Sequence, residues 1–275
     1  MAPPFGGLEP CTSRARARGR ASREYSSPVR SRDRQIDFEL APDPEVGLGV
    51  FETLLVLDGQ ARELDRHLER LRSSVRALYG SQLPDGLRAR VRSAGAGQAL
   101  ARLRIDFVPG TPEVGVQTSP LDPGVVLGAA EVALATVAVP AGPGAHKLID
   151  RRWLARIEAA AGEGVAPLLV SRSGALLETT RANVFLLRDG ELATPPLDGS
   201  ILPGVIRALL LERARALGIP AREVGLTLAD LHGADTVLLS NSLRLLERAR
   251  VRPGRRSAEA LARLREAIDP RGGGA

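Results

Sequence analysis

One lysine stands out among the residues that could perform chemistry. Lys147 is the only lysine among the 38 Lys and Arg residues, and all the others are arginine. A buried lysine amine can lose its proton near neutral pH and form a Schiff base, whereas a guanidinium stays charged and does neither. The count leaves two interpretations open, a surface residue in an arginine-rich composition or a covalent anchor. The neighbourhood of Lys147 must separate them.

Four short patterns contain residues that could act together with this lysine. They lie at residues 67–71 (HLERL), 146–152 (HKLIDRR), 177–185 (LETTRANVF) and 201–207 (ILPGVIR). Together they offer an amine, guanidinium groups, carboxylates and a Pro-Gly helix start, whose free amides favour an anion. Taken singly, Glu178 is typical of a strand edge and Arg70 of a solvated helix face.

The elements that must hold these patterns form two predicted lobes. Residues 36–139 form a small N-terminal α/β lobe, 140–145 (PAGPGA) a linker, and 146–271 a larger C-terminal lobe. The alternation of apolar residues, the helical spacing from Leu64 onward and the turn residues that separate the segments support this division. The mixture predicts an α/β (α+β) fold.

Each lobe has its own predicted elements. In the first lobe we expect strands at 50–57, 101–108 and within 113–119, helices from Leu64 and over 84–94, and an apolar run at 125–139. In the second lobe we expect helices at 148–161, from 202 to 217, 228–232 and 257–268, and strands at 166–171, 183–188, 191–194, 221–226 and 236–239.

Composition excludes several classes of protein. The single cysteine, Cys11, excludes an internal disulfide framework and a cysteine-rich zinc site. The histidines 67, 146 and 232 stand in unrelated contexts, so we expect no metal site. No stretch approaches the ~20 apolar residues of a membrane span, and the chain start has no apolar signal region. We therefore expect a cytoplasmic protein that does not contact membranes.

The positive charge is concentrated at the start of the chain. Residues 1–34 contain eight Arg and three acidic residues, whereas the remainder carries 30 basic and 29 acidic groups. We interpret residues 1–35, rich in Arg, Ser and Pro, as a disordered tail. A nucleic-acid arm, a targeting peptide or a misplaced start codon would look the same. Because the rest is nearly neutral, we expect no nucleic-acid partner.

The order and spacing of the four patterns resemble the fold-type IV pyridoxal 5'-phosphate (PLP) enzymes. The resemblance covers roughly residues 46–251. This family contains branched-chain and D-amino acid aminotransferases and 4-amino-4-deoxychorismate lyase. It implies a two-lobed fold with the cofactor between the lobes, and a homodimer.

The resemblance also implies a role for each site residue. Lys147 would be the catalytic residue that holds PLP as a Schiff base and moves protons, and Glu178 would contact the pyridine nitrogen. Arg70, Gly204, the amides of Val205 and Ile206, and Ser242 would bind the cofactor phosphate.

Within the family, the sequence is most similar to the lyase. An Asn241-Ser242-Leu243 segment and the Lys147-x-x-Asp150-Arg151 pattern are typical of it. The implied reaction converts 4-amino-4-deoxychorismate to 4-aminobenzoate and pyruvate, a step toward folate. The substrate is a small amine with two carboxylates, and our candidates to bind it are Arg151, Arg181, Arg244 and Asn241.

Two departures from the family pattern keep alternatives open. The usual opening strand is not visible before Val46, and the usual Gly-Asp-Gly is Gly47-Leu48-Gly49 here. One alternative is a branched-chain or D-amino acid aminotransferase of the same family. A second is a non-catalytic homologue that binds PLP or a partner.

Overall fold

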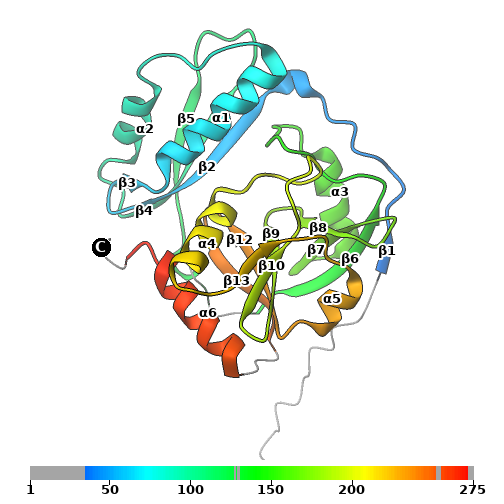
Figure 1. The fold of residues 1–275 in the computed structure, drawn as a ribbon. Helices are drawn as coiled ribbons and strands as arrows, with labels where there is room; N and C mark the ends of the chain where they lie inside the picture. Colours follow the sequence, from blue (N-terminus) through cyan, green and yellow to red (C-terminus); the bar gives the residue numbers. More distant parts are fainter. Residues whose placement is uncertain (1–34, 127, 129–130, 252–254, 272–275) are drawn as a thin grey trace, which may run out of the picture. The chain divides into compact units, whose positions relative to one another are not determined.

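The computed structural model describes residues 35–126, 128, 131–251 and 255–271 (Figure 1). Within this part of the chain, helices and strands alternate and build two separate sheets. The mixed α/β class is therefore confirmed. The predicted tail, residues 1–35, lies outside the described residues except for Gln35, which begins a strand.

The smaller sheet is antiparallel and carries two helices on one face. Its strands follow the order β3-β2-β4-β5, with bounds Gln60–Ala61, Val50–Leu57, Leu100–Phe107 and Gly115–Pro120. The helices are α1 (Leu64–Tyr79) and α2 (Leu87–Gly95). Apolar residues of α1 such as Leu71 and Val75 pack with Leu54 and Leu103 in one buried core.

Strands β2 and β4 present different chemistry on their two faces, because successive side chains of a strand alternate. Leu54 of β2 and Leu103 of β4 face the helices. The alternate positions, among them Phe51 and Thr53 of β2 and Arg102 of β4, line a cavity. The small sheet therefore forms both a core and a cavity wall.

The larger sheet has nine strands and is mixed. Its main path is β1-β6-β7-β8-β9-β10-β11, and β12 pairs with both β9 and β13. The bounds in that order are Gln35–Asp37, Ala133–Val139, Val165–Ser171, Leu176–Thr179, Asn183–Arg188, Glu191–Thr194 and Ala221–Glu223, then Thr236–Asn241 for β12 and Leu245–Val251 for β13.

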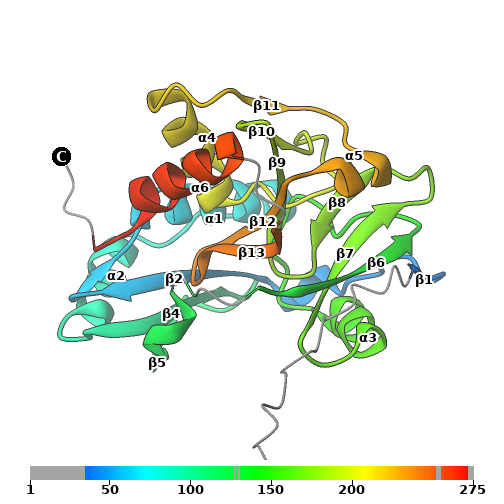
Figure 2. The same ribbon diagram turned by 90° about the horizontal axis from the view of Figure 1, so that it is seen from below.

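In the described ranges, the remaining helices accompany this sheet (Figure 2). Helix α3 (Arg152–Ala161) lies against β6 and β7, and α4 (Val205–Ala216) lies against α6 (Arg255–Ile268) and β12. Helix α5 (Leu228–Gly233) begins with a capping box between Thr227 and Asp230. The core under α4 and α6 includes Phe185 and also Leu55 of β2, so the two sheets share buried contacts.

Strand pairing places two segments differently from the predicted lobes. Strands β1 and β6 fall within residues 36–139, apart from Gln35, yet both belong to the larger sheet, since β1 pairs with β6 and β6 pairs with β7. A short strand, β1, thus precedes Val46, where the sequence showed none. The predicted helix over 148–161 begins only at Arg152.

Candidate active site

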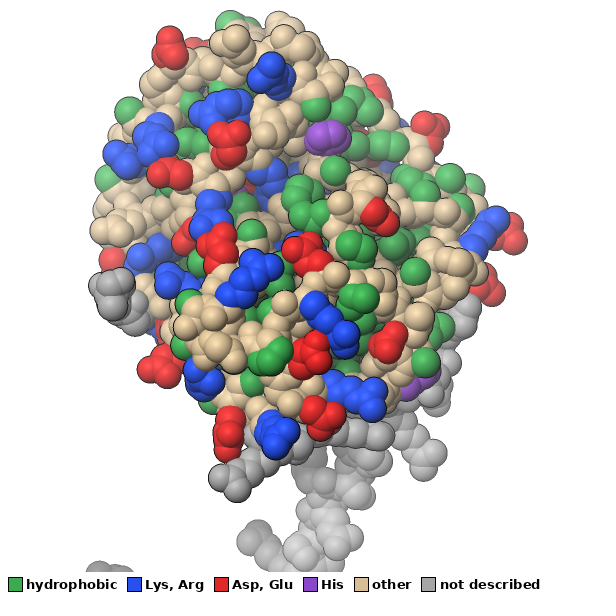
Figure 3. Space-filling view, in the orientation of Figure 1, with side chains coloured by type: hydrophobic (Ala, Val, Ile, Leu, Met, Phe, Trp, Pro, Cys, Tyr) green, Lys and Arg blue, Asp and Glu red, His purple; other side chains and the backbone are tan. Residues whose placement is uncertain are grey.

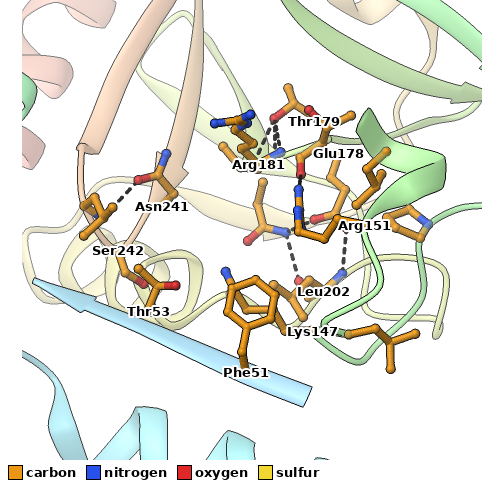
Figure 4. A pocket seen from close by; sticks show the side chains of 18 of the residues that line it. Phe51, Thr53, Lys147, Arg151, Glu178, Thr179, Arg181, Leu202, Asn241 and Ser242 are labelled. Carbon is orange, nitrogen blue, oxygen red and sulfur yellow. Dashed lines mark hydrogen bonds between the residues drawn. The ribbon is translucent and has the colours of Figure 1, made fainter. Parts of the chain in front are cut away.

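One cavity of about 480 Å³ lies between the larger sheet and the face of the small sheet that points away from α1 and α2. All eleven predicted site residues line it, and Figure 4 shows side chains from β2, from the segments around Lys147 and Glu178, and from the end of β12 surrounding it. Residues that are distant in sequence therefore meet in one place. Their individual roles remain predictions.

Lys147 is positioned by backbone pairing with the small sheet. Its carbonyl accepts a hydrogen bond from Phe51 N (2.9 Å), and Ile149 N donates to Gly49 O (2.9 Å). The Lys147 Nζ lies 5.0 Å from the centre of the Phe51 ring. Burial, aided by the positive charge of Arg70, lowers the Lys147 pKa to about 8. A substantial fraction of this amine is therefore neutral near physiological pH.

Glu178 lies on β8, directly opposite Asn183 of β9. Residues directly opposite in an antiparallel pair share a face, so the two side chains meet. Asn183 Nδ2 donates to Glu178 Oε2 (2.8 Å), and Leu202 N donates to Oε1 (3.0 Å). Burial nevertheless raises the Glu178 pKa to about 8, because it outweighs the hydrogen bond from Leu202 and the nearby charge of Lys147.

Asn183 is a structural residue of the site that the sequence prediction omitted. Besides its bond to Glu178, its Nδ2 donates to Leu202 O (2.9 Å). It therefore ties β8 and β9 to the segment that leads into α4. An amide in an otherwise apolar strand was the available signal.

Arg70 is held by a buried carboxylate. Its Nε and one terminal nitrogen each donate to a different oxygen of Glu52 (both 2.7 Å), and the other terminal nitrogen donates to Pro203 O (3.0 Å). His67 Nδ1 lies 2.7 Å from the same Glu52 carboxylate. Burial alone would raise the Glu52 pKa, but Arg70 and His67 lower it to about 2. Glu52 and His67 were not predicted as site residues, because only the packing of α1 on β2 brings them together.

The start of α4 provides unsatisfied donors. The first amides of any α-helix lack intrahelical acceptors, and no side chain caps this end at Gly204. Nearby, Ser240 is 2 % exposed and lines the cavity, yet its hydroxyl has no hydrogen-bond partner among the described residues. The Arg70 guanidinium also lies at this end of the cavity, because it donates to the carbonyl of Pro203, the residue directly before Gly204. This end of the cavity therefore suits an anion.

The turn after β12 is shaped by Asn241. Its Oδ1 accepts hydrogen bonds from Leu243 N (3.0 Å) and Arg244 N (2.9 Å). That oxygen is thus engaged in the turn. Ser242 lies within the turn and lines the cavity.

The predicted substrate arginines differ in their partners. Arg181 forms two hydrogen bonds to Glu158 (2.8 and 2.6 Å) and Arg244 pairs with Glu247 (2.8 Å). Arg151 instead donates to the Thr180 carbonyl (2.6 Å). Arg102 and Arg104 of β4 also line the cavity and were not predicted as site residues. The alternation of apolar and polar residues in one strand shows which face is buried, but not which other element lies opposite its polar face.

The described residues contain no group of three or more His, Cys, Asp or Glu side chains that could hold a metal ion. On the face shown in Figure 3, acidic and basic side chains are interspersed. None of the helices in the described ranges is long and apolar enough to cross a membrane.

Comparison with known proteins gives a family and several relatives. Residues 49–250 match the model of the family described as amino-transferase class IV. The bifunctional aminodeoxychorismate lyase / D-amino acid transaminase of Mycobacterium tuberculosis is 31% identical over 242 residues, 76% of this chain and 83% of that protein.

Two solved structures have a similar fold. A "hypothetical aminotransferase" from Mycobacterium tuberculosis in its PLP-bound form has a TM-score of 0.70 and 28% identity, covering 83% of this chain and 92% of the other. A fold IV transaminase from Curtobacterium pusillum has a TM-score of 0.64 and 23% identity, covering 82% and 88%.

Proposed function

Because the chain belongs to the amino-transferase class IV family, we propose that it is a lyase that converts 4-amino-4-deoxychorismate to 4-aminobenzoate and pyruvate. Family membership confirms the predicted fold-type IV class and PLP as the cofactor. The observation that carries the proposal is the meeting of Lys147, Glu178 and the free start of α4 in one cavity.

The described residues fit PLP at both of its ends. The α4 amides of Val205 and Ile206, the orphaned Ser240 hydroxyl and Arg70 would hold the phosphate. Glu178 would face the pyridine nitrogen and Lys147 would hold the aldehyde carbon. When bound, PLP supplies an electron sink for the electron pair left at the amine-bearing carbon of the substrate.

Lys147 is suited to accept a proton from the substrate and then to donate it again. With a pKa of about 8, its Nζ can remove the proton from the amine-bearing ring carbon. The same nitrogen would then protonate the ether oxygen as the enolpyruvyl group leaves. The ring becomes aromatic, and the enol becomes pyruvate.

Glu178 is suited to exchange a proton with a ring nitrogen. At neutral pH its carboxyl, with a pKa of about 8, carries a proton that a basic nitrogen can take. The Leu202 amide and the Asn183 side chain then stabilise the resulting carboxylate. With PLP bound, the proton would then lie on the pyridine nitrogen and the negative charge on Glu178.

One feature supports the lyase over other members of the family. The turn Asn241-Ser242-Leu243 resembles the lyase pattern. The name of the 31% identical relative includes both a lyase and a D-amino acid transaminase, so it is compatible with either activity. A D-amino acid or branched-chain aminotransferase of the same family is our second candidate.

The substrate requirement separates the two candidates. The purified enzyme should receive 4-amino-4-deoxychorismate without any keto acid, and pyruvate and 4-aminobenzoate should be measured. We expect equal amounts of both products. Turnover that requires an amino donor and a keto acceptor would instead support the aminotransferase.

A homodimer is also part of the proposal, on the basis of the family resemblance. Sedimentation equilibrium of the full chain should give twice the mass of 29.1 kDa. A monomer that is fully active would contradict it.

A further inference from the structure

Six arginine side chains line the cavity, and four of them are neutralised by a carboxylate. The six are Arg70, Arg102, Arg104, Arg151, Arg181 and Arg244. The neutralised four pair with Glu52, Asp106, Glu158 and Glu247, at distances of 2.6–2.8 Å. Arg104, Arg181 and Arg244 therefore already have their anion, whereas Arg70 lies between Glu52 and the place proposed for the cofactor phosphate.

Arg102 and Arg151 have no such anion. Neither forms an ion pair with a carboxylate in the described ranges, and Arg151 makes its hydrogen bond to a neutral carbonyl, that of Thr180. Arg151 is partly buried, and burial lowers its pKa, although the nearby carboxylates of Glu158 and Glu178 act in the opposite direction without forming an ion pair with it. Two positive charges in this cavity are therefore available to a ligand.

These two arginines approach the cavity from different elements. Arg102 lies on the cavity face of β4, next to Arg104, whose guanidinium lies 3.9 Å from the centre of the Phe51 ring. Arg151 lies between Lys147 and α3, and in Figure 4 its side chain extends toward the segment of Glu178 and Arg181. Two anchors on separate walls suit a ligand with two separated anionic groups.

We propose that Arg102 and Arg151 each bind one carboxylate of a dicarboxylate substrate, and that Arg181 and Arg244 do not. This rests on the proposed function and gives it a recognition mechanism. Guanidinium–carboxylate pairs of this kind are charge-assisted, and each is strong enough to select a ligand. The arrangement favours a substrate with two carboxylates over an ordinary amino acid with one.

Ligand binding tests this without any turnover. The probe is 3-(carboxymethoxy)benzoate, which has one carboxylate on a ring and another across an ether oxygen, and lacks the amine. Benzoate and phenoxyacetate each retain one of its carboxylates. Calorimetry would measure the affinity of all three compounds for the PLP-loaded wild type. The same measurement would be made on the variants Arg102→Gln, Arg151→Gln, Arg181→Gln and Arg244→Gln. The control is Arg213→Gln, on the exposed side of α4.

We expect Arg102→Gln and Arg151→Gln each to weaken dicarboxylate binding by about 10-fold or more, the range of a charge-assisted hydrogen bond. Each of these two variants should weaken the binding of only one of the two monocarboxylates, benzoate or phenoxyacetate. Arg213→Gln should bind as the wild type does. No binding to the wild type at millimolar probe, or losses at Arg181 or Arg244 in place of these two, would overturn the inference.

A merely structural effect of Arg151 has a different signature. If Arg151 acted only by holding Thr180 in place, Arg151→Gln would alter the Glu178 segment and shift the absorption band of bound PLP. We expect this band to be unchanged in Arg151→Gln, and we expect Arg151→Lys to recover part of the dicarboxylate affinity. A shifted band without loss of affinity would assign Arg151 a structural role only.

Failure of the inference and failure of the proposed function give different results. If pyruvate is released but the KM for 4-amino-4-deoxychorismate is the same in Arg102→Gln and Arg151→Gln as in the wild type, the inference is wrong and the lyase stands. If the probe binds through both arginines but no pyruvate forms, the lyase is wrong while dicarboxylate recognition stands.

Discussion

Asn183 occupies the space in which residue 204 would place a side chain. A Cβ atom at Gly204 would lie 1.9 Å from Asn183 Oδ1. The same Asn183 amide holds Glu178 and the Leu202 carbonyl. Gly204 is therefore required by packing within the site, in addition to its place at the start of α4.

Gly204→Ala should weaken both the fold and the cofactor site. The methyl group must displace Asn183 or the start of α4, and overpacking of this kind costs about 1–3 kcal/mol. We expect a lower thermal midpoint and PLP binding weakened on the order of tenfold. Thermal denaturation and absorbance titration measure the two effects.

Two further variants test the origin of this effect. Gly225→Ala is the matched control, because a methyl group at that position would have no atom within 4 Å, and it should be near neutral. Asn183→Ala should create room, so the double variant should be more stable than the sum of the single effects, with a coupling of about 1 kcal/mol or more. Simple additivity would show that the contact is not the cause.

Glu52→Gln should destabilise the protein at neutral pH by about 3–5 kcal/mol, since it breaks a buried ion pair. The folded Glu52 pKa of about 2 lies below its ordinary 4.5, so the stability that this carboxylate contributes is present above pH 4.5 and lost as pH falls through 2. The difference between wild type and variant should shrink by about 3 kcal/mol between pH 5 and pH 2.

Urea unfolding across this pH range provides the measurement. Glu69→Gln is the control, because Glu69 is on the same α1 helix and pairs with Arg72, but its side chain is 66% exposed. A difference between wild type and Glu52→Gln that stays constant with pH would refute the assigned role of the Glu52 charge.

The single lysine makes the pKa of Lys147 directly measurable. Only the neutral amine reacts with acetic anhydride, and a lowered pKa shifts the neutral form to lower pH. In the cofactor-free protein, acetylation of Lys147 should be half-maximal near pH 8 rather than near 10.5. Peptide mapping separates this residue from the N-terminal amine. A reaction that keeps rising beyond pH 10 would contradict the desolvated environment.

Glu178→Gln should separate cofactor attachment from turnover. Glutamine offers one acceptor oxygen for the two donors at Leu202 and Asn183 and cannot supply a proton to a ring nitrogen. We expect PLP to remain attached to Lys147 and kcat to fall by about 10²-fold or more. Turnover within threefold of the wild type would exclude Glu178 from the chemistry.

Local sequence patterns predicted most elements where the periodicity is strong. Helix α1 starts at Leu64 as expected, and β2 has the predicted bounds. The helix predicted over 148–161 begins late, because residues 147–149 pair with β2 and Asp150 Oδ1 accepts from Arg152 N (3.0 Å). Tertiary pairing overrode the helical spacing there.

Local sequence patterns did not predict short strands, strands of mixed polarity or side-chain networks that depend on tertiary packing. Strand β13 has charged residues such as Arg248 among its apolar ones, and β1 has only three residues. The Glu52–His67 contact depends on packing α1 against β2. By contrast, every site residue that the family resemblance predicted lines one cavity. The resemblance did not distinguish arginines that pair with a carboxylate from those that do not.

Borohydride reduction of the PLP-loaded protein tests the central role of Lys147 most directly. After reduction and digestion, mass spectrometry should find the phosphopyridoxyl group on the peptide that contains Lys147 and on no other, and Lys147→Arg should carry none. A protein that cannot be loaded with PLP, or that carries the group elsewhere, would contradict the account.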